Sequence, residues 1–236
     1  VLNYDEDDEE PITLPSIFPN LLCNPNEGLG VGLASNWGCS NLGEVAQAIY
    51  NYMDGKEFSL SPDFPTGGMV INKNIIKTIN ETGKGSLKIR GKYHVEDNQI
   101  IFTEIPYKVT IEAILESVAN ACDKGEIQGV EDIQDYSDRN GINIVITCEK
   151  NANINLIVKK LFAKTLLQTS FAYNQIALVN KTPTLLNLRQ CIEVYLSHNK
   201  ECLIKEFNFD LKRIKERLHI IDGLLIALED IDNIIE

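Results

Sequence analysis

Gly28-Leu29-Gly30-Val31-Gly32-Leu33, within the longer stretch from Pro19 to Asn36, is the segment from which the fold is best inferred. Glycines alternate with apolar residues, so in an extended chain one side carries no β-carbons and the other displays the apolar side chains. A backbone without β-carbons allows another molecule or another part of the chain to come close. By itself, the pattern is typical of a glycine-rich turn that leads into a buried strand.

A nucleotide-binding loop is a second interpretation of these glycines, and the neighbouring residues argue against it. No apolar strand precedes Gly28, and no Lys followed by Ser or Thr comes after the glycines. The Pro-Asn and Asn-Glu pairs before Gly28 are turn residues. We therefore do not interpret the stretch as a phosphate-binding loop.

The rest of the chain predicts a mixture of helices and strands. Leu42–Met53 is expected to be a helix, with Asn41 as its N-cap and Glu44 completing a capping box. The other expected helices and strands are a strand at Met69–Ile71, a helix at Asn74–Asn80, strands at Ser86–Val95 and Ile100–Ile105, a helix at Thr110–Cys122, strands at Val130–Asp135 and Ile142–Cys148, a helix at Asn153–Ala163 and a strand at Gln175–Val179.

The elements from Gln99 onward follow a β-α-β-β-α order. This order predicts a small antiparallel or mixed sheet with helices on one face. Arg139-Asn140-Gly141 is expected to be the tight hairpin turn between its last two strands. The predicted fold class is therefore α+β: an α/β body followed by a long C-terminal helix.

The C-terminal segment has a different pattern, typical of a coiled coil. We expect a helix that starts near Asn187 and continues to Glu236. Apolar residues recur at alternating spacings of three and four, which is the heptad pattern of a helix that pairs with another helix. These seam residues are Ile204, Phe207, Leu211, Ile214, Leu218, Ile221, Leu225 and Leu228. We expect self-association or pairing in a crystal lattice through this seam.

The formal net charge of −12 is unusual for a protein that binds nucleic acid, so the distribution of charge matters more than its sum. Residues 1–60 carry ten acidic side chains and one basic, whereas residues 61–181 are neutral overall. The candidates for contact with a phosphate backbone are Lys84, Lys88, Arg90 and Lys92. We expect the side chains of Lys88, Arg90 and Lys92 on one face of the single strand Ser86–Val95.

The N-terminus, the cysteines and the histidines indicate the broad class of the protein. The acidic run Asp5–Glu10 is expected to be a surface loop or linker. The six cysteines form no C-x-x-C pair and lie apart in sequence from the three histidines, so we expect reduced thiols, no metal site and a cytoplasmic location. No signal peptide and no apolar run long enough to cross a membrane is present in the sequence.

Several motifs in a fixed order resemble the A subunit of bacterial type IIA DNA topoisomerases, the family of DNA gyrase and topoisomerase IV. The resemblance extends over essentially the whole chain. The matching motifs are Pro19–Leu22, Gly28–Ala34, Asn41–Val45, Pro62–Gly68, Glu81–Ser86, Glu104–Tyr107, Asp135–Gly141, Leu167–Phe171 and Gly223–Leu228.

The resemblance implies a role for Leu29. In this family the residue at that position is an aliphatic wedge that enters between base pairs from the minor groove, and it belongs to a symmetric pair that bends the gate DNA. Gly28, Gly30 and Gly32 would then be the glycines that flank the wedge. Partial unstacking of a base step costs a few kcal/mol, which phosphate contacts to the bent duplex offset.

The resemblance also implies partners, cofactors and missing parts. The parent enzyme is expected to be an ATP-dependent isomerase that works with double-stranded DNA, with the B subunit, which supplies Mg²⁺ and ATP, and with a second A subunit. We expect no cofactor and no catalytic residue in this chain, because the DNA-cleaving tyrosine is expected upstream of Val1. On this interpretation the chain is a fragment that holds and bends DNA without cutting it. The resemblance does not separate gyrase from topoisomerase IV.

The same resemblance suggests where the parts of the chain begin and end. The expected divisions are an acidic linker at 1–15, a tower base with the DNA-facing wedge at 16–99, a small α/β unit at 100–165, a return to the tower base at 166–186 and the ascending arm of a coiled coil at 187–236. The alternative function is a structural or assembly module built on the coiled-coil helix, in which Gly28–Gly32 only leads into a strand.

Two places depart from the family's pattern. Trp37-Gly38-Cys39-Ser40 stands where the family usually has an aliphatic residue, two prolines and a histidine. Ile111-Glu112 replaces an expected lysine with an acidic local character. Both changes lie close to motifs that are expected to face DNA.

Overall fold

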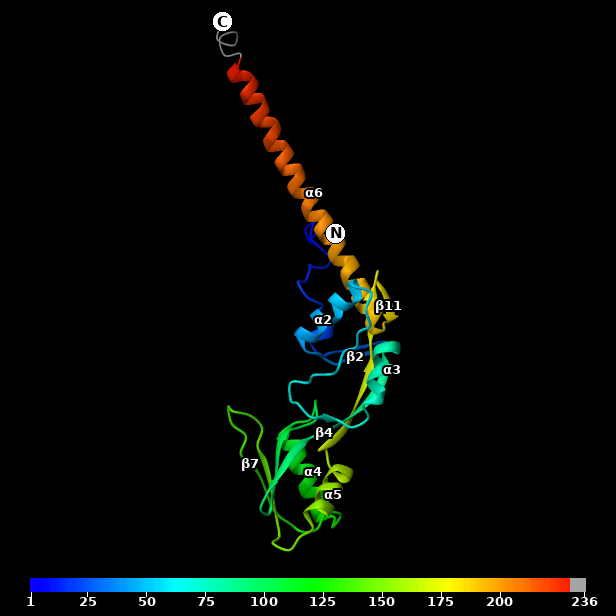
Figure 1. Ribbon diagram of the computed structural model, residues 1–236, viewed down its shortest axis with the longest axis vertical. Helices are drawn as coiled ribbons and strands as arrows, with labels where there is room; N and C mark the ends of the chain where they lie inside the picture. Colours follow the sequence, from blue (N-terminus) through cyan, green and yellow to red (C-terminus); the bar gives the residue numbers. More distant parts are fainter. Residues whose placement is uncertain (230–236) are drawn as a thin grey trace. The chain divides into compact units, whose positions relative to one another are not determined.

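A computed structural model describes residues 1–229 (Figure 1). The chain divides into two compact units, one formed by residues 19–191 and the other by residues 1–18 together with residues from Ile192 onward. The end of the expected C-terminal helix, residues 230–236, lies outside the described residues. The larger unit contains all the sheets described below.

The first sheet is antiparallel and has five strands, in the order β1-β2-β9-β4-β3. Its strands are β1 (Asn26–Gly30), β2 (Leu33–Trp37), β3 (Met69–Val70), β4 (Lys84–Arg90) and β9 (Gln168–Asn174). The central pair is β4 with β9, in register from Lys84 opposite Asn174 to Arg90 opposite Gln168.

One face of the first sheet forms an apolar core. Leu87 and Ile89 from β4 pack there with Phe171 from β9. Helix α3 (Asn74–Thr82) contributes Ile79 to the same cluster. The β4 side chains that alternate with Leu87 and Ile89 point to the opposite face, because neighbouring residues of a strand alternate between faces.

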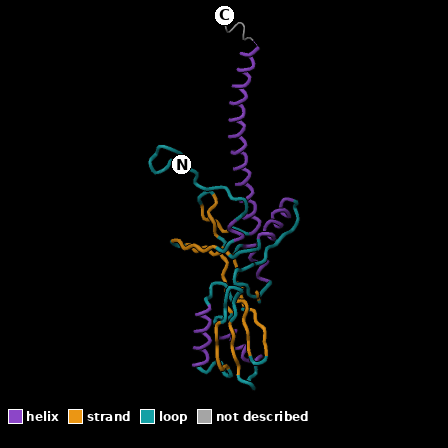
Figure 2. The backbone as a smooth tube through the Cα atoms, turned by 90° about the vertical axis from the view of Figure 1, so that its left-hand side faces the viewer, coloured by secondary structure: helices purple, strands orange, loops and turns teal. Residues whose placement is uncertain are grey.

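The second sheet is also antiparallel, with the order β5-β6-β8-β7. Its strands are β5 (Lys92–Glu96), β6 (Gln99–Glu104), β7 (Val130–Asp135) and β8 (Ile144–Cys148). Helices α4 (Ile111–Asp123) and α5 (Ile154–Lys164) cover one face, and Figure 2 shows them on one side of the orange strands. Phe102, Ile146 and Leu161 are buried between the layers. The α+β fold class and the helices on one face of this sheet are confirmed.

The prediction of a single strand over Ser86–Val95 is wrong. The strand is interrupted at Gly91. As a result β4 belongs to the first sheet and β5 to the second. Gly91 N donates to Leu167 O at 2.9 Å, and a β-carbon at Gly91 would lie 2.9 Å from Glu104 O. The two-residue period continues across the break because the strand on each side of Gly91 has residues that face a core. For β4 this is the core of the first sheet, and for β5 it is the core of the second.

Several further predictions agree with the structure. Helix α2 occupies Leu42–Met53, although the Asn41 side chain accepts from Gly43 N at 2.9 Å and not from Glu44, so the cap is simpler than predicted. The turn at Arg139–Gly141 is present, with paired hydrogen bonds between Asp138 and Gly141. Helix α3 ends at Thr82, two residues later than expected.

Four strands were not expected from the sequence, in addition to the division at Gly91. Three of them, β1, β2 and β9, are in the first sheet. A fourth, β11 (Thr182–Leu185), pairs with β10 (Ile176–Val179) across an Asn180-Lys181 turn in which both residues have positive φ, 50° and 66°. Positive φ at both central residues is the signature of the type I′ hairpin turn.

The remaining helices are α1 (Asn20–Cys23) and α6 (Leu188–Glu229). Helix α6 starts one residue after the predicted position, and the Asn187 side chain caps it by accepting from Gln190 N at 2.8 Å. In the smaller unit, the Tyr195 hydroxyl on α6 donates to Ile17 O at 2.6 Å. The acidic run lies exposed, as expected, in a loop held by a bridge between Leu2 and Glu9.

Within residues 1–229, no helix combines the length and the apolar character needed to cross a membrane.

Candidate nucleic-acid interface

The glycine-rich stretch forms a hairpin. Strands β1 and β2 pair from Asn26 opposite Trp37 to Gly30 opposite Leu33, and a two-residue turn joins them. Gly32 in this turn has φ +79°, a conformation that residues with a side chain rarely adopt. Figure 2 shows the hairpin extending sideways from the other strands of its unit. The first prediction for this stretch, a turn leading into a buried strand, is wrong because both strands are largely exposed.

Leu29 lies on β1 near the tip and is 86% exposed. Its neighbours Gly28 and Gly30 are not required by the packing of the protein itself. A β-carbon at Gly28 would lie 3.9 Å from the Ser35 β-carbon, and one at Gly30 would lie 3.7 Å from Leu33 O, both ordinary contact distances. The bare face of β1 is therefore free for close approach by another molecule.

The register of the strands connects Leu29 to the cationic strand β4. Leu29 opposes Ala34, and Asn36, two residues along β2, opposes Asn174 on β9. Asn174 in turn opposes Lys84. Opposed residues of antiparallel strands share a face, as do residues two apart in one strand. By register, Leu29 and Lys84 belong to the same face of the five-stranded sheet.

Two of the four predicted cations are available on this face. Lys84 and Lys88 alternate with the buried residues of β4, are exposed, and form no ion pair with any residue in the described part of the chain. Arg90 is engaged: its Nε and Nη2 both donate to Gln168 Oε1, at 2.9 and 2.6 Å, and its guanidinium lies 4.3 Å from the centre of the Phe162 ring.

Lys92 lies in the second sheet, so the expectation that Lys88, Arg90 and Lys92 share one strand face is wrong. Its Nζ is 3.0 Å from Glu104 Oε1. Glu104 Oε2 also accepts from Gly68 N at 2.6 Å, and this backbone hydrogen bond, with help from Lys92, lowers the pKa of the carboxyl. Gly67 and Gly68 both have positive φ, and a β-carbon at Gly67 would overlap the Glu104 side chain. This contact explains the glycine pair that ends the Pro62–Gly68 motif.

Lys108 is a cation at the hairpin that sequence reasoning missed. Its Nζ lies 2.5 Å from Glu27 Oε2 and donates to Asn36 Oδ1 at 3.0 Å. Because Glu27 and Lys108 are 81 residues apart in sequence, no local pattern indicates that they meet.

The seam residues of α6 are all exposed, with exposed fractions from 40% at Ile221 to 65% at Phe207. The neighbouring positions are not uniformly charged, since Ile220, Leu224 and Ile226 are also exposed. Leu203 and Phe209 are exposed as well, so the apolar surface extends beyond the seam along the described helix.

Comparison with known proteins decides the family. The family model that describes the A subunit of DNA gyrase and topoisomerase IV matches residues 1–236. The chain belongs to this family. It is 42% identical to the DNA gyrase A subunit of Ureaplasma parvum serovar 3 over all of this chain, and 41% and 38% identical to the same subunit of Clostridium acetobutylicum and Streptococcus pneumoniae serotype 4 over 99% of it. The chain spans about 30% of the length of each of these relatives.

In this family member, Trp37 and Ile111 from the two departures pack into the fold, whereas Glu112 does not. Trp37 is 1% exposed, and its Nε1 donates to Ile176 O at 3.1 Å and to Ser35 Oγ at 2.9 Å. The tryptophan thus joins the root of the β1–β2 hairpin to β10. Ile111 begins helix α4 and packs against the core of the second sheet, whereas Glu112 is exposed in the first turn of that helix.

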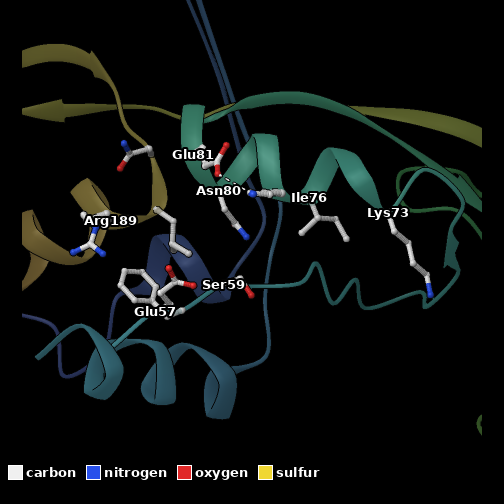
Figure 3. A pocket seen from close by; sticks show the side chains of 11 residues that line it. Glu57, Ser59, Lys73, Ile76, Asn80, Glu81 and Arg189 are labelled. Carbon is white, nitrogen blue, oxygen red and sulfur yellow. Dashed lines mark ion pairs between the residues drawn. The ribbon is translucent and has the colours of Figure 1, made fainter. Parts of the chain in front are cut away.

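A cleft in this member of the gyrase and topoisomerase IV family is lined by residues outside the hairpin (Figure 3). It is an open cleft of about 800 Å³, and Glu57, Ser59, Lys73, Asn80 and Arg189 contribute to its lining. Asn80 Nδ2 donates to Leu60 O at 3.1 Å. The lining mixes both signs of charge, and we find no convergent set of nucleophile, base and oxyanion donors there.

The thiols and acidic residues suggest no metal centre in the described part of the chain. The six cysteines are free, and no group of three His, Cys, Asp or Glu side chains among the described residues is placed to hold a metal ion. Cys39 is buried, and its Sγ donates to Asp63 O at 2.9 Å. Burial and the nearby Asp63 carboxylate raise the pKa of this thiol.

Proposed function

We propose that this chain binds duplex DNA and bends it as the DNA-gate region of a type IIA topoisomerase A subunit. The observation that carries the proposal is the exposure of Leu29 on a glycine-flanked hairpin whose face, by register, is also that of Lys84 and Lys88. Covering an exposed leucine with an apolar partner is favourable in water, and a partly opened base step provides such a partner.

In the mechanism that we assign to this chain, the protein deforms the duplex and makes no covalent change in it. Leu29 enters a base step and partly unstacks it, at a cost of a few kcal/mol, and the duplex bends. Lys84 and Lys88 then contact the phosphates of the bent duplex, which releases counterions and offsets the cost. Gly28 and Gly30, on either side of Leu29 in β1, add no side chains to the strand that carries the wedge. We assign no residue of this chain to DNA cleavage.

The activity of the whole protein follows from the family as a proposal. The relatives are named as the A subunit of DNA gyrase, and we infer that this chain serves an ATP-dependent isomerase that passes one duplex through another. The partners are double-stranded DNA, a second A subunit, and a B subunit that supplies Mg²⁺ and ATP. The exposed seam of α6 further favours pairing with another helix in a coiled coil.

Salt dependence of DNA binding tests the proposal. Lys84→Ala with Lys88→Ala, in a full-length A subunit that contains this chain, should reduce the slope of log affinity against log salt by about 1.8, since each phosphate contact contributes about 0.9. Lys159→Ala with Lys160→Ala makes the same change in net charge on helix α5 and should leave the slope unchanged. Equal slopes in both double variants would contradict the assignment of Lys84 and Lys88.

A further inference from the structure

The β1–β2 hairpin is joined to its sheet by little backbone. β2 and β9 share one opposed pair, Asn36 with Asn174. A two-stranded hairpin is marginally stable by itself in water, so side chains at the root determine how firmly the hairpin is held. Two amides assist there: Asn36 Nδ2 donates to Ala172 O, and Asn174 Nδ2 donates to Ala34 O. Both of these bonds involve β2, whereas Leu29 is on β1.

Lys108 reaches both strands of the hairpin. Its ammonium pairs with Glu27 on β1 at 2.5 Å and donates to Asn36 on β2 at 3.0 Å. Glu27 and Asn36 oppose each other in the ladder. One cation therefore holds the two strands together at the root of the hairpin.

Lys108 is itself fixed to the core of the first sheet. It follows Tyr107, whose ring is stacked on Phe64 with 5.0 Å between the ring centres, and its Nζ lies 5.1 Å from the centre of the Phe171 ring. Its backbone has φ +67°, and a residue with a side chain keeps such a conformation only where its surroundings hold it. The lysine thus links the hairpin to a buried aromatic cluster.

We propose that Lys108 is a positioning residue that sets the direction in which Leu29 projects. Leu29 lies two residues beyond Glu27 on β1, so the two side chains share a face. A shift in the position of Glu27 therefore also shifts Leu29, because one short strand carries both. The proposal rests on the function proposed above and adds a residue to it. In this role the ammonium remains with Glu27 and Asn36 while DNA is bound.

The test compares bending with binding in a full-length A subunit that contains this chain, assembled with its B subunit. Fluorescence energy transfer across a gate duplex labelled at both ends measures the bent fraction of bound DNA. Lys108→Met keeps the length of the side chain and removes its charge, and it should lower the ratio of bent to straight complexes about two- to fivefold, the scale of a partly exposed ion pair. Glu27→Gln should act in the same direction, and Lys108→Arg should restore bending.

The controls separate this inference from the proposed function. Lys164→Met breaks a comparable ion pair, with Glu126 at 3.3 Å, on helix α5, and should leave bending unchanged. If Leu29→Ala abolishes bending but Lys108→Met and Glu27→Gln do not change it, the positioning role is overturned and the wedge remains. A fall of about 0.9 in the salt slope for Lys108→Met, with bending intact, would make Lys108 a phosphate contact and also overturn the proposal. Bending that persists in Leu29→Ala would overturn the proposed function itself.

Discussion

Gly30 and Gly83 show that glycines serve two different purposes in this chain. Gly83 ends helix α3 with φ +73°, and a β-carbon there would lie 2.2 Å from Leu186 O, so the fold itself requires glycine. At Gly30 the nearest atom to a β-carbon would be Leu33 O at 3.7 Å. The fold tolerates a side chain at Gly30, and we attribute the glycine to its external partner.

Alanine at these two positions should therefore have opposite consequences. Gly83→Ala should lower the free energy of unfolding by about 1–3 kcal/mol, because it combines a strained backbone with a backbone clash. Gly30→Ala should change it by less than about 0.5 kcal/mol, yet weaken binding to gate DNA. Urea denaturation and a DNA-binding titration measure the two effects. A loss of stability in Gly30→Ala as large as that in Gly83→Ala would show that the fold requires both glycines.

Glu104 gives the fold a dependence on pH. Its pKa is lowered mainly by the hydrogen bond from Gly68 N and also by Lys92, so its carboxylate form is favoured in the folded state. A group whose pKa is lower when folded stabilises the fold above its unfolded pKa, and this contribution is lost as the pH falls through the folded value. Glu104→Gln should thus be less stable than the parent at pH 7, and the difference should shrink below about pH 4. A constant difference between pH 7 and pH 3, measured by thermal unfolding, would contradict this.

At the scale of elements, helices and the second sheet could be predicted because their periodicity is local. Strand β9 was not predicted, although it has the same kind of local pattern. Phe171 and Tyr173 face the core, while the residues that alternate with them face outward. The hairpin β1–β2 has no buried face along most of its length, so no alternation of apolar and polar residues indicated it. The division at Gly91 could not be predicted because the two-residue period does not show which sheet a strand joins.

The α6 seam makes an element-scale prediction. A helix with this much exposed apolar surface is expected to be covered by another helix. Leu218→Asp should weaken that pairing by roughly 1.5–3 kcal/mol, or about ten- to a hundredfold in Kd, which is the value of burying one leucine. Glu216→Ala, away from the seam, is the matched control. Sedimentation measures association, and circular dichroism measures helix content. Equal values of both in the parent and in Leu218→Asp would contradict a role of the seam in pairing.

At the scale of the whole molecule, charge and family could be inferred from sequence, but the geometry of the interface could not. The net charge of −12 hides a local surface on which Lys84 and Lys88 have no ion-pair partner in the described chain. Arg90 belonged to the same stretch by composition, yet its contacts with Gln168 and Phe162 direct it inward. Those contacts depend on residues more than 70 positions away, which no local pattern reports.

The central claim is that Leu29 bends DNA, and the bend angle of gate DNA bound to a full-length A subunit containing this chain tests it most directly. Leu29→Ala should leave the fold intact, since the side chain is 86% exposed, and should abolish the bent state seen by energy transfer across the duplex. Leu178→Ala, at a 72% exposed leucine on the β10–β11 hairpin, is the control and should bend DNA normally. An unchanged bend angle in Leu29→Ala would contradict the claim.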